Sequence, residues 1–159
     1  MEYKISLLSQ FSQSEQDKYL TTIAGWHQQQ WTDKCIETRM QQLECYRYNK
    51  EIPLMYLAHE TELMGSIAIN KNQNTHQIKE SESASVWISN LYVDNKYRQK
   101  GVGRSLLAMV ISAMKKTPCT TLYLTTNDQQ QFYKNRGWQE LPSKMGRSKN
   151  LSLFRYGLM

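Results

Sequence analysis

Residues 90–107 read NLYVDNKYRQKGVGRSLL. This stretch predicts the end of a buried strand, a basic loop with two glycines, and the first turn of a helix. The first N–H groups of a helix have no partner within it, and the helix dipole adds partial positive charge, so a helix start can hold an anion. Gly101 and Gly103 would let the backbone turn its N–H groups inward. The cations of the loop are Arg98, Lys100 and Arg104. The stretch alone predicts either an anion site or a tight strand-to-helix turn.

Two familiar phosphate loops are excluded by single residues. A dinucleotide fingerprint needs a third glycine at position 106, where this chain has Leu106. A P-loop needs Gly-Lys-Ser/Thr, which the sequence lacks. Any anion site here is therefore of another kind.

Hydrophobic periodicity on either side of this stretch predicts a mixed α/β chain. Helices are expected at about 14–30, at about 33–48, from the basic loop to 116, and at about 128–136. Strands are expected at 3–8, 52–58, 63–69, 86–93, 121–125, 138–141 and 151–158. The strand 86–93 is apolar on both faces, which places it in the middle of the sheet, and the unit 86–125 should be a parallel crossover. Residues 70–85 and 144–149 predict loops, the second of them basic.

Local chemistry adds detail to three of these elements. Ser12 and Ser14, followed by Glu15, offer N-terminal capping for the first helix, and Asp33 does so for the second. Ser89-Asn90 interrupts the central strand, where a bulge is expected.

The composition limits the class of protein. With 159 residues, 40% hydrophobic and 21% charged, the chain should form one globular domain, 1–159. No apolar run approaches the length of a membrane span, and the N-terminus is a poor signal peptide. The cysteines, Cys35, Cys45 and Cys119, are odd in number and widely spaced, so neither a metal site nor a disulfide framework is expected. A cytoplasmic location with mostly buried thiols fits best.

The net charge of +6 is unevenly distributed. Residues 1–95 contain 8 Lys/Arg and 12 Asp/Glu, whereas residues 96–159 contain 12 Lys/Arg and 2 Asp/Glu. The basic part is compatible with nucleic acid or with a small ligand rich in phosphate, and the acidic part with a cationic substrate. Charge alone predicts a solvated surface about as well.

Two motifs with the right separation resemble the GCN5-related N-acetyltransferase (GNAT) superfamily. The first is the strand end Leu91-Tyr92-Val93-Asp94 followed by Arg98-Gln99-Lys100-Gly101-Val102-Gly103, and the second is Phe132-Tyr133-Lys134-Asn135-Arg136-Gly137-Trp138. The resemblance is clear over about 86–140, while 1–85 agrees in element order only. It implies a single-domain α/β fold with a mixed, splayed, mostly antiparallel sheet flanked by helices. It also implies that 86–140 binds acetyl-coenzyme A and that 1–85 supplies the acceptor side.

The resemblance further implies where the donor binds. The pyrophosphate would lie on the N–H groups of 99–104, which include Val102 and Arg104, and the pantetheine arm would pair with the backbone of 91–93. Asn127 would contact the arm and Tyr133 would lie beside the sulfur. The chain departs from the family pattern at Trp138, usually Phe, and in a separation from Asn127 to Tyr133 that is shorter by one residue. Asp128 or Gln129 could therefore replace Asn127.

The chemistry needs three groups. The backbone N–H of Leu91 is the candidate donor to the oxyanion, and Tyr133 is the candidate acid for the leaving thiolate, with a packing role as the alternative. The general base stays open among Asp94, Glu60, Glu44, His27 and His59, each of which could equally be structural. Trp26 and Trp31 could form an acceptor wall or pack in the core.

These inferences predict an acetyl-coenzyme A-dependent N-acetyltransferase acting by direct attack on an amine of a small molecule or peptide, without metal, nucleic acid or membrane. A homodimer stays open. The alternative functions are a non-catalytic acyl-coenzyme A-binding or regulatory domain and a nucleic-acid binder, although the chain lacks an aromatic-and-basic RNA-binding motif.

Overall fold

The computed structural model describes residues 2–71, 85–142 and 152–158. The expected loops at 70–85 and 144–149 therefore lie largely or wholly outside the described residues. The chain divides into two units: the first contains 1–69 and 90–110, and the second contains 70–89 and 111–159. Strand β4 (Ser85–Val93) and helix α3 (Val102–Lys115) each contribute residues to both units.

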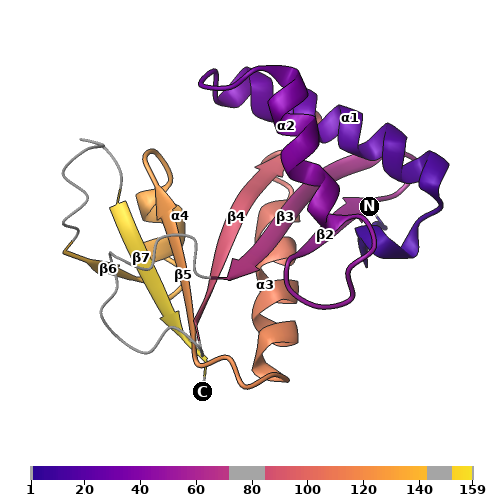
Figure 1. Cartoon of the computed structure of the whole chain (residues 1–159). Coiled ribbons are helices and arrows are strands. Elements are labelled where there is room, and N and C mark those ends of the chain that lie inside the picture. The colour runs from indigo at the N-terminus through magenta and orange to yellow at the C-terminus, as the bar shows by residue number, and fades with distance from the viewer. Residues whose placement is uncertain (1, 72–84, 143–151, 159) are drawn as a thin grey trace. The chain divides into compact units, whose positions relative to one another are not determined.

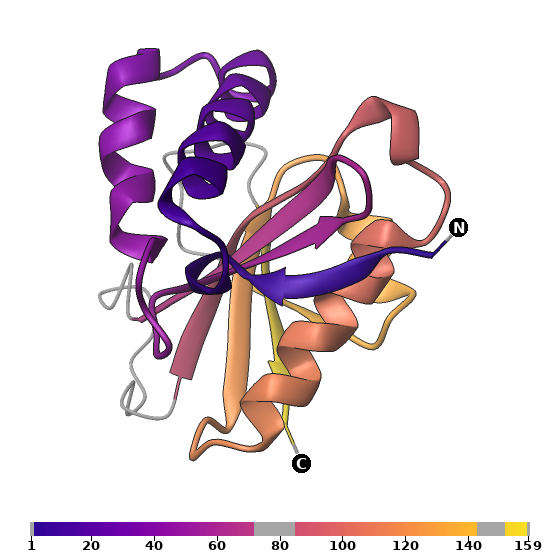
Figure 2. The same cartoon turned by 90° about the vertical axis from the view of Figure 1, so that its right-hand side faces the viewer.

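The first unit builds three antiparallel strands and two helices before it reaches β4. Its elements are β1 (Lys4–Leu7), η1 (Leu8–Gln10), α1 (Gln13–Gln30), α2 (Ile36–Leu43), η2 (Glu44–Tyr46), β2 (Leu54–His59) and β3 (Leu63–Lys71). Strand β2 pairs with β1 on one side and with β3 on the other. Helices α1 and α2 cover one face of these strands, and the first half of α3 lies on the other face (Figure 2).

The core of the first unit fills the space between these helices and strands. Ile23 and Trp26 of α1 pack in one cluster with Met55 and Leu57 of β2. Tyr92 of β4 belongs to the same cluster, so the central strand is fixed to the helical layer by an aromatic side chain. Trp26 is therefore a core residue, as the packing alternative predicts.

Helix α1 begins as its sequence predicts. The Ser12 hydroxyl accepts a hydrogen bond from the Glu15 N–H, and the Glu15 carboxylate accepts one in return from the Ser12 N–H. This reciprocal capping box satisfies two of the free donors at the helix start.

The prediction for the second helix is wrong at both ends. Helix α2 begins after Cys35, which makes no side-chain cap, and its last turn tightens into η2. Asp33, the expected cap, instead pairs with the Arg39 guanidinium at 2.8 Å. The Asp33 carboxylate therefore binds the buried Arg39 guanidinium and does not cap the first N–H groups of α2.

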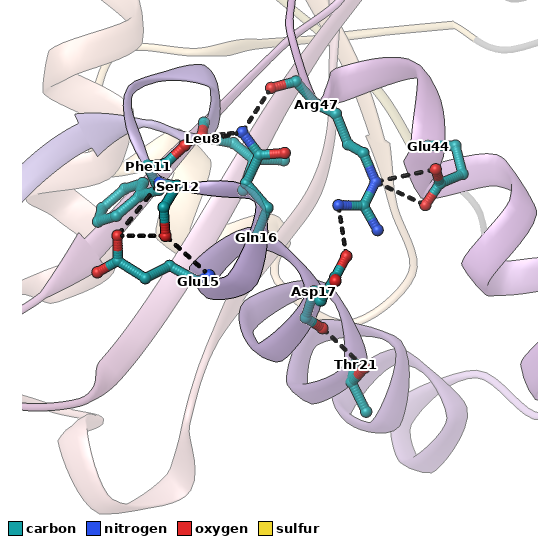
Figure 3. A network of polar contacts seen from close by, with 9 residues as sticks. All are labelled: Leu8, Phe11, Ser12, Glu15, Gln16, Asp17, Thr21, Glu44 and Arg47. Carbon is teal, nitrogen blue, oxygen red and sulfur yellow. Dashed lines mark hydrogen bonds and ion pairs between the residues drawn. The ribbon is translucent and has the colours of Figure 1, made fainter.

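A polar network fixes the start of α1 against η2 (Figure 3). The Gln16 amide is buried and donates to the carbonyl oxygens of Leu8, Phe11 and Arg47 at 3.0–3.2 Å. The Arg47 guanidinium, only 10% exposed, pairs with Asp17 and Glu44, each at 2.8 Å. A nearly buried cation thus has two carboxylate partners.

Replacing Arg47 should lower the free energy of unfolding more than replacing an exposed cation does. Arg47→Met should lower the free energy of unfolding by about 1–3 kcal/mol, because the two carboxylates lose their partner but remain half-exposed to water. Urea unfolding measures the loss. The matched control, Lys134→Met, breaks the 3.2 Å pair with Glu140, whose side chains are both at least 40% exposed, and should cost less than about 1 kcal/mol. Equal losses would contradict a structural role for the network.

Strand β3 approaches β4 closely at a glycine. A Cβ atom on Gly65 would lie 2.8 Å from the Tyr92 carbonyl oxygen and 3.2 Å from Leu106 of α3. Only glycine allows this approach. Two residues before Tyr92 in β4, Asn90 has a left-handed φ of +57°, at the place where the sequence predicts a bulge.

The second unit carries the rest of the sheet. Its remaining elements are β5 (Thr121–Thr126), α4 (Gln130–Lys134), β6 (Gln139–Leu141) and β7 (Ser152–Gly157). Strand β5 lies beside β7 (Figure 1), which pairs antiparallel with β5 and β6. The pair β4–β5 is parallel, as a crossover through α3 requires.

The hydrogen-bonded strand order is β1-β2-β3-β4-β5-β7-β6, and β4–β5 is the parallel pair in an otherwise mostly antiparallel sheet. The expected mixed α/β fold is confirmed. The expected burial of the thiols is wrong for two of them, since Cys35 and Cys45 are exposed and Cys119 is half-buried. Cys35 precedes α2, and its sulfur lies 3.1 Å from the Thr38 hydroxyl, so the side chain lies at the start of the helix and outside the core.

Candidate active site

The basic loop has the backbone of an anion site. Gln99 and Gly101 both adopt left-handed backbone, with φ of +61° and +83°. Helix α3 follows at once, and its first hydrogen bond runs from the Ser105 N–H to the Gly101 carbonyl at 3.0 Å. The N–H groups of residues 102–104 precede that bond and are therefore free to bind a ligand.

The charges at this helix start also fit an anion. The first turn of α3 contains no acidic residue and does contain Arg104, a cation at the end where the dipole favours negative charge. Lys100 and Arg104 are exposed, and their side chains form no hydrogen bond or ion pair with any described residue. The loop thus combines the backbone geometry and the charge that a polyanion site needs.

The two glycines of the motif have different roles. Gly101 is left-handed, but Gly103 lies within α3 with ordinary helical backbone. The prediction that both glycines redirect the backbone is therefore wrong for Gly103, and Gln99 takes the second left-handed position. A non-glycine residue in this conformation is strained, and such strain concentrates at ligand sites.

The entry to the loop is fastened to the β2–β3 hairpin. The Asp94 N–H donates to the Met64 carbonyl at 2.9 Å. Lys96 Nζ pairs with Glu62 Oε1 at 2.8 Å, and the Tyr97 hydroxyl donates to the same oxygen. These hydrogen bonds hold the pKa of Glu62 below its ordinary value. Sequence reasoning missed Glu62, because it is 34 residues from Lys96 and no local pattern connects them.

The end of β4 is partly buried and follows a left-handed residue. Tyr92 is buried, Leu91 and Val93 are half-buried, and the left-handed Asn90 immediately precedes Leu91. Residues 91–93 and 98–104, which the family resemblance assigns to the donor, all lie in the first unit.

The carboxylate candidates for the general base have structural partners or turn positions. Asp94 accepts a hydrogen bond from the Lys96 N–H and so caps the short helix η5 (Asn95–Tyr97). Glu44 is paired with Arg47. Glu60 is exposed in the hairpin turn, where its N–H donates to the Glu62 carbonyl.

The histidine candidates are poorly suited to be a base. His27 is 3% exposed, and burial, followed by the charge of Arg39, lowers its pKa to about 4. A general base works best with a pKa near the operating pH. His59 contacts the Ser6 hydroxyl at 3.0 Å, and burial also lowers its pKa. Trp31 is half-buried against His27, at 5.2 Å between ring centres.

The second unit contains the other two predicted site residues. Tyr133 on α4 is 6% exposed and contacts the rings of Phe132, Trp138 and Phe154. Its hydroxyl forms no hydrogen bond with any residue in the described part of the chain. Burial, helped by the charge of Asp128, raises the pKa of Tyr133 well above its ordinary range. The phenol is therefore protonated at neutral pH and can act as a donor.

Asn127 lies in the bend that leads into α4. It is exposed, and its carbonyl oxygen accepts a hydrogen bond from the Gln130 amide at 3.2 Å. This contact uses the backbone of Asn127, so its side-chain amide stays accessible.

Two general features of the described residues bear on function. None of their helices combines the length and apolar character of a membrane span. Their His, Cys, Asp and Glu side chains form no group of three that could hold a metal ion.

The sequence matches the model of the Acetyltransferase (GNAT) family over residues 12–138. The matched range includes the anion loop and Tyr133. A search of curated protein sequences gives no significant match.

Solved structures share the fold at low sequence identity. An acetyltransferase of the GNAT family from Staphylococcus aureus is 19% identical with a TM-score of 0.70, and the alignment covers 99% of this chain and 100% of that one. Ard1 from Thermoplasma volcanium is 17% identical with a TM-score of 0.71, covering 100% and 99%. N-acetylglutamate synthase from Neisseria gonorrhoeae, solved with coenzyme A and N-acetyl-glutamate, is 16% identical with a TM-score of 0.69, covering 100% of this chain and 36% of that one.

Proposed function

Because the chain belongs to the acetyltransferase (GNAT) family, whose members use acetyl-coenzyme A, we propose that it acetylates an amine of a small molecule or peptide by direct attack. The observation that carries the proposal is the start of α3. There the first N–H groups of the helix at 102–104 and the left-handed Gly101 suit the pyrophosphate of the donor, as do Lys100 and Arg104, which pair with no residue in the described ranges.

The donor supplies an activated acetyl thioester, and the chain positions it. We assign the backbone of Leu91, Tyr92 and Val93 to the pantetheine arm, and the Asn127 amide to a further contact with that arm. Residues 99–104 bind the phosphates, and Arg98 lies at the entrance of the loop. The left-handed Asn90 supports this assignment, because a residue of that conformation interrupts strand pairing beside Leu91.

The reaction moves two protons and one acetyl group. The lone pair of the neutral amine forms the new C–N bond, while the Leu91 N–H donates a hydrogen bond to the carbonyl oxygen as negative charge develops there. The C–S bond then breaks, and the Tyr133 hydroxyl gives its proton to the leaving sulfur. The amine releases its extra proton to water, and water returns a proton to the Tyr133 oxygen, since the five residues considered for the base are engaged, lie in a turn or have a lowered pKa.

The charge of residues 1–95 gives slight support for a cationic acceptor. Asp17, Asp33, Glu44 and Glu62 form ion pairs within the chain, but the partners of the first three, Arg39 and Arg47, are already counted in the charge balance of that part. The balance therefore remains negative, and neutral amines belong in the panel as the comparison.

The test is a thiol-release assay with acetyl-coenzyme A over a broad panel of amines, with the acetylated product identified by mass. We expect release above the rate of hydrolysis with at least one amine. Binding of the donor without release across the panel would favour the non-catalytic acyl-coenzyme A-binding alternative. Absence of binding would contradict the proposal entirely.

Steady-state kinetics test the direct-attack mechanism. Direct attack predicts intersecting lines when initial rates are measured at varied concentrations of both substrates, whereas parallel lines would indicate a covalent acetyl-enzyme. The cysteines are free, which supports our assignment to the cytoplasm. Light scattering decides between a monomer and a homodimer.

A further inference from the structure

Arg98 opens the basic motif, but its side chain is already engaged within the protein. Its Nε donates to the Val93 carbonyl at 2.8 Å, and the central carbon of its guanidinium lies 5.1 Å from the centre of the Tyr92 ring. The arginine thus contacts the backbone and the side chain of two successive residues at the end of β4.

These contacts connect Arg98 to the core of the first unit. The Tyr92 ring is stacked on Trp26 of α1, at 5.2 Å between ring centres and an interplanar angle of 24°. The His27 ring lies at 70° to the same ring, at 6.4 Å between ring centres. Tyr92 and Trp26 are 7% and 8% exposed, so the guanidinium is fastened to a buried aromatic pair.

The other two cations of the loop are not held in this way. The side chains of Lys100 and Arg104 form no hydrogen bond or ion pair with the described residues, and Arg104 only lies over Gly101. A guanidinium can donate in its plane and stack on a ring at the same time, which a lysine ammonium does less well. Arg98 therefore differs from Lys100 and Arg104, because only its side chain is engaged by described residues of the protein.

We propose that Arg98 is a positioning residue, which holds the Val93 carbonyl and the Tyr92 ring so that the end of β4 keeps its course, while Lys100 and Arg104 supply the charge for the phosphates. This inference rests on the proposed function, because it assigns roles within the donor site. It also predicts that Arg98 acts on the donor through Tyr92.

The first experiment measures the Kd of coenzyme A by calorimetry from about 50 to about 300 mM salt, where screening changes strongly. Lys100→Met should weaken binding and reduce its salt dependence, because a charge has been lost. Arg98→Met should raise the Kd by about fivefold or more without changing the salt dependence. Arg98→Lys keeps the charge but loses the paired contacts, so it should behave like Arg98→Met.

The second experiment is a double-mutant cycle with Tyr92→Leu. The loss from Arg98→Met should largely disappear in the Tyr92→Leu background, because the group through which it acts is gone. A cycle of Arg98→Met with Lys100→Met should instead be additive, because the two cations act through different groups, and this cycle keeps the test valid if Tyr92→Leu fails to fold.

Two results would overturn the inference: rescue of binding by Arg98→Lys, or a fall in salt dependence with Arg98→Met equal to that with Lys100→Met. Either would make Arg98 a counter-charge to the phosphates. If the unmodified chain fails to bind coenzyme A at all, the proposed function is wrong and this inference falls with it.

Discussion

Tyr133→Phe should lower kcat by about 100-fold, the lower end of the range for a positioned acid. The hydroxyl is the only atom removed, and the ring contacts with Phe132, Trp138 and Phe154 can persist. Burial raises the pKa of this phenol, so it is protonated throughout the neutral range and its loss should be felt at every pH assayed. The Kd of acetyl-coenzyme A should stay within about twofold, since the acid acts mainly in the transition state.

Tyr156→Phe is the matched control. Tyr156 is half-buried on β7 and also contacts Trp138, at 5.3 Å between ring centres. This variant should retain the kcat of the unmodified chain. If Tyr133→Phe retains it too, Tyr133 is a packing residue and the proton reaches the thiolate from elsewhere.

Gly101→Val should raise the Kd of coenzyme A by about tenfold or more, as a change of about 1.4 kcal/mol would. The φ of +83° is accessible to glycine, whereas a β-branched side chain strongly disfavours it. The loop would relax toward negative φ and turn the N–H groups of 102–104 away from the phosphates. Calorimetric titration measures the change directly.

A control separates this local effect from a general loss of stability. Arg47→Met destabilises the chain without altering the anion loop, so it should leave the Kd unchanged at temperatures where it is folded. If Arg47→Met weakens binding as much as Gly101→Val does, the left-handed turn has no special role in holding the donor.

The parts of the fold that sequence reasoning predicted correctly depend on neighbouring residues. The Ser12–Glu15 capping box, the left-handed Gly101 and the interruption at Asn90 are each set by residues a few positions apart. The left-handed turn before α3 is of this kind, so the sequence alone predicts it.

The features that sequence reasoning missed depend on how side chains turn once the elements have packed. Asp33 pairs with Arg39 instead of capping α2, and Arg98 turns toward Tyr92, although each pair is only six residues apart. Glu62 contacts Lys96 from 34 residues away, and the Tyr92 ring is fixed by the distant Trp26. No local spacing rule predicts these contacts, because tertiary packing selects them.

The most direct test of the donor site follows the backbone amides of the anion loop. In a two-dimensional 1H–15N spectrum, titration with coenzyme A should shift the resonances of residues 99–104 most strongly, led by Val102, Gly103 and Arg104. Saturable shifts concentrated there would support the assignment of the pyrophosphate to the start of α3. Saturable shifts elsewhere, with these amides unmoved, would contradict it.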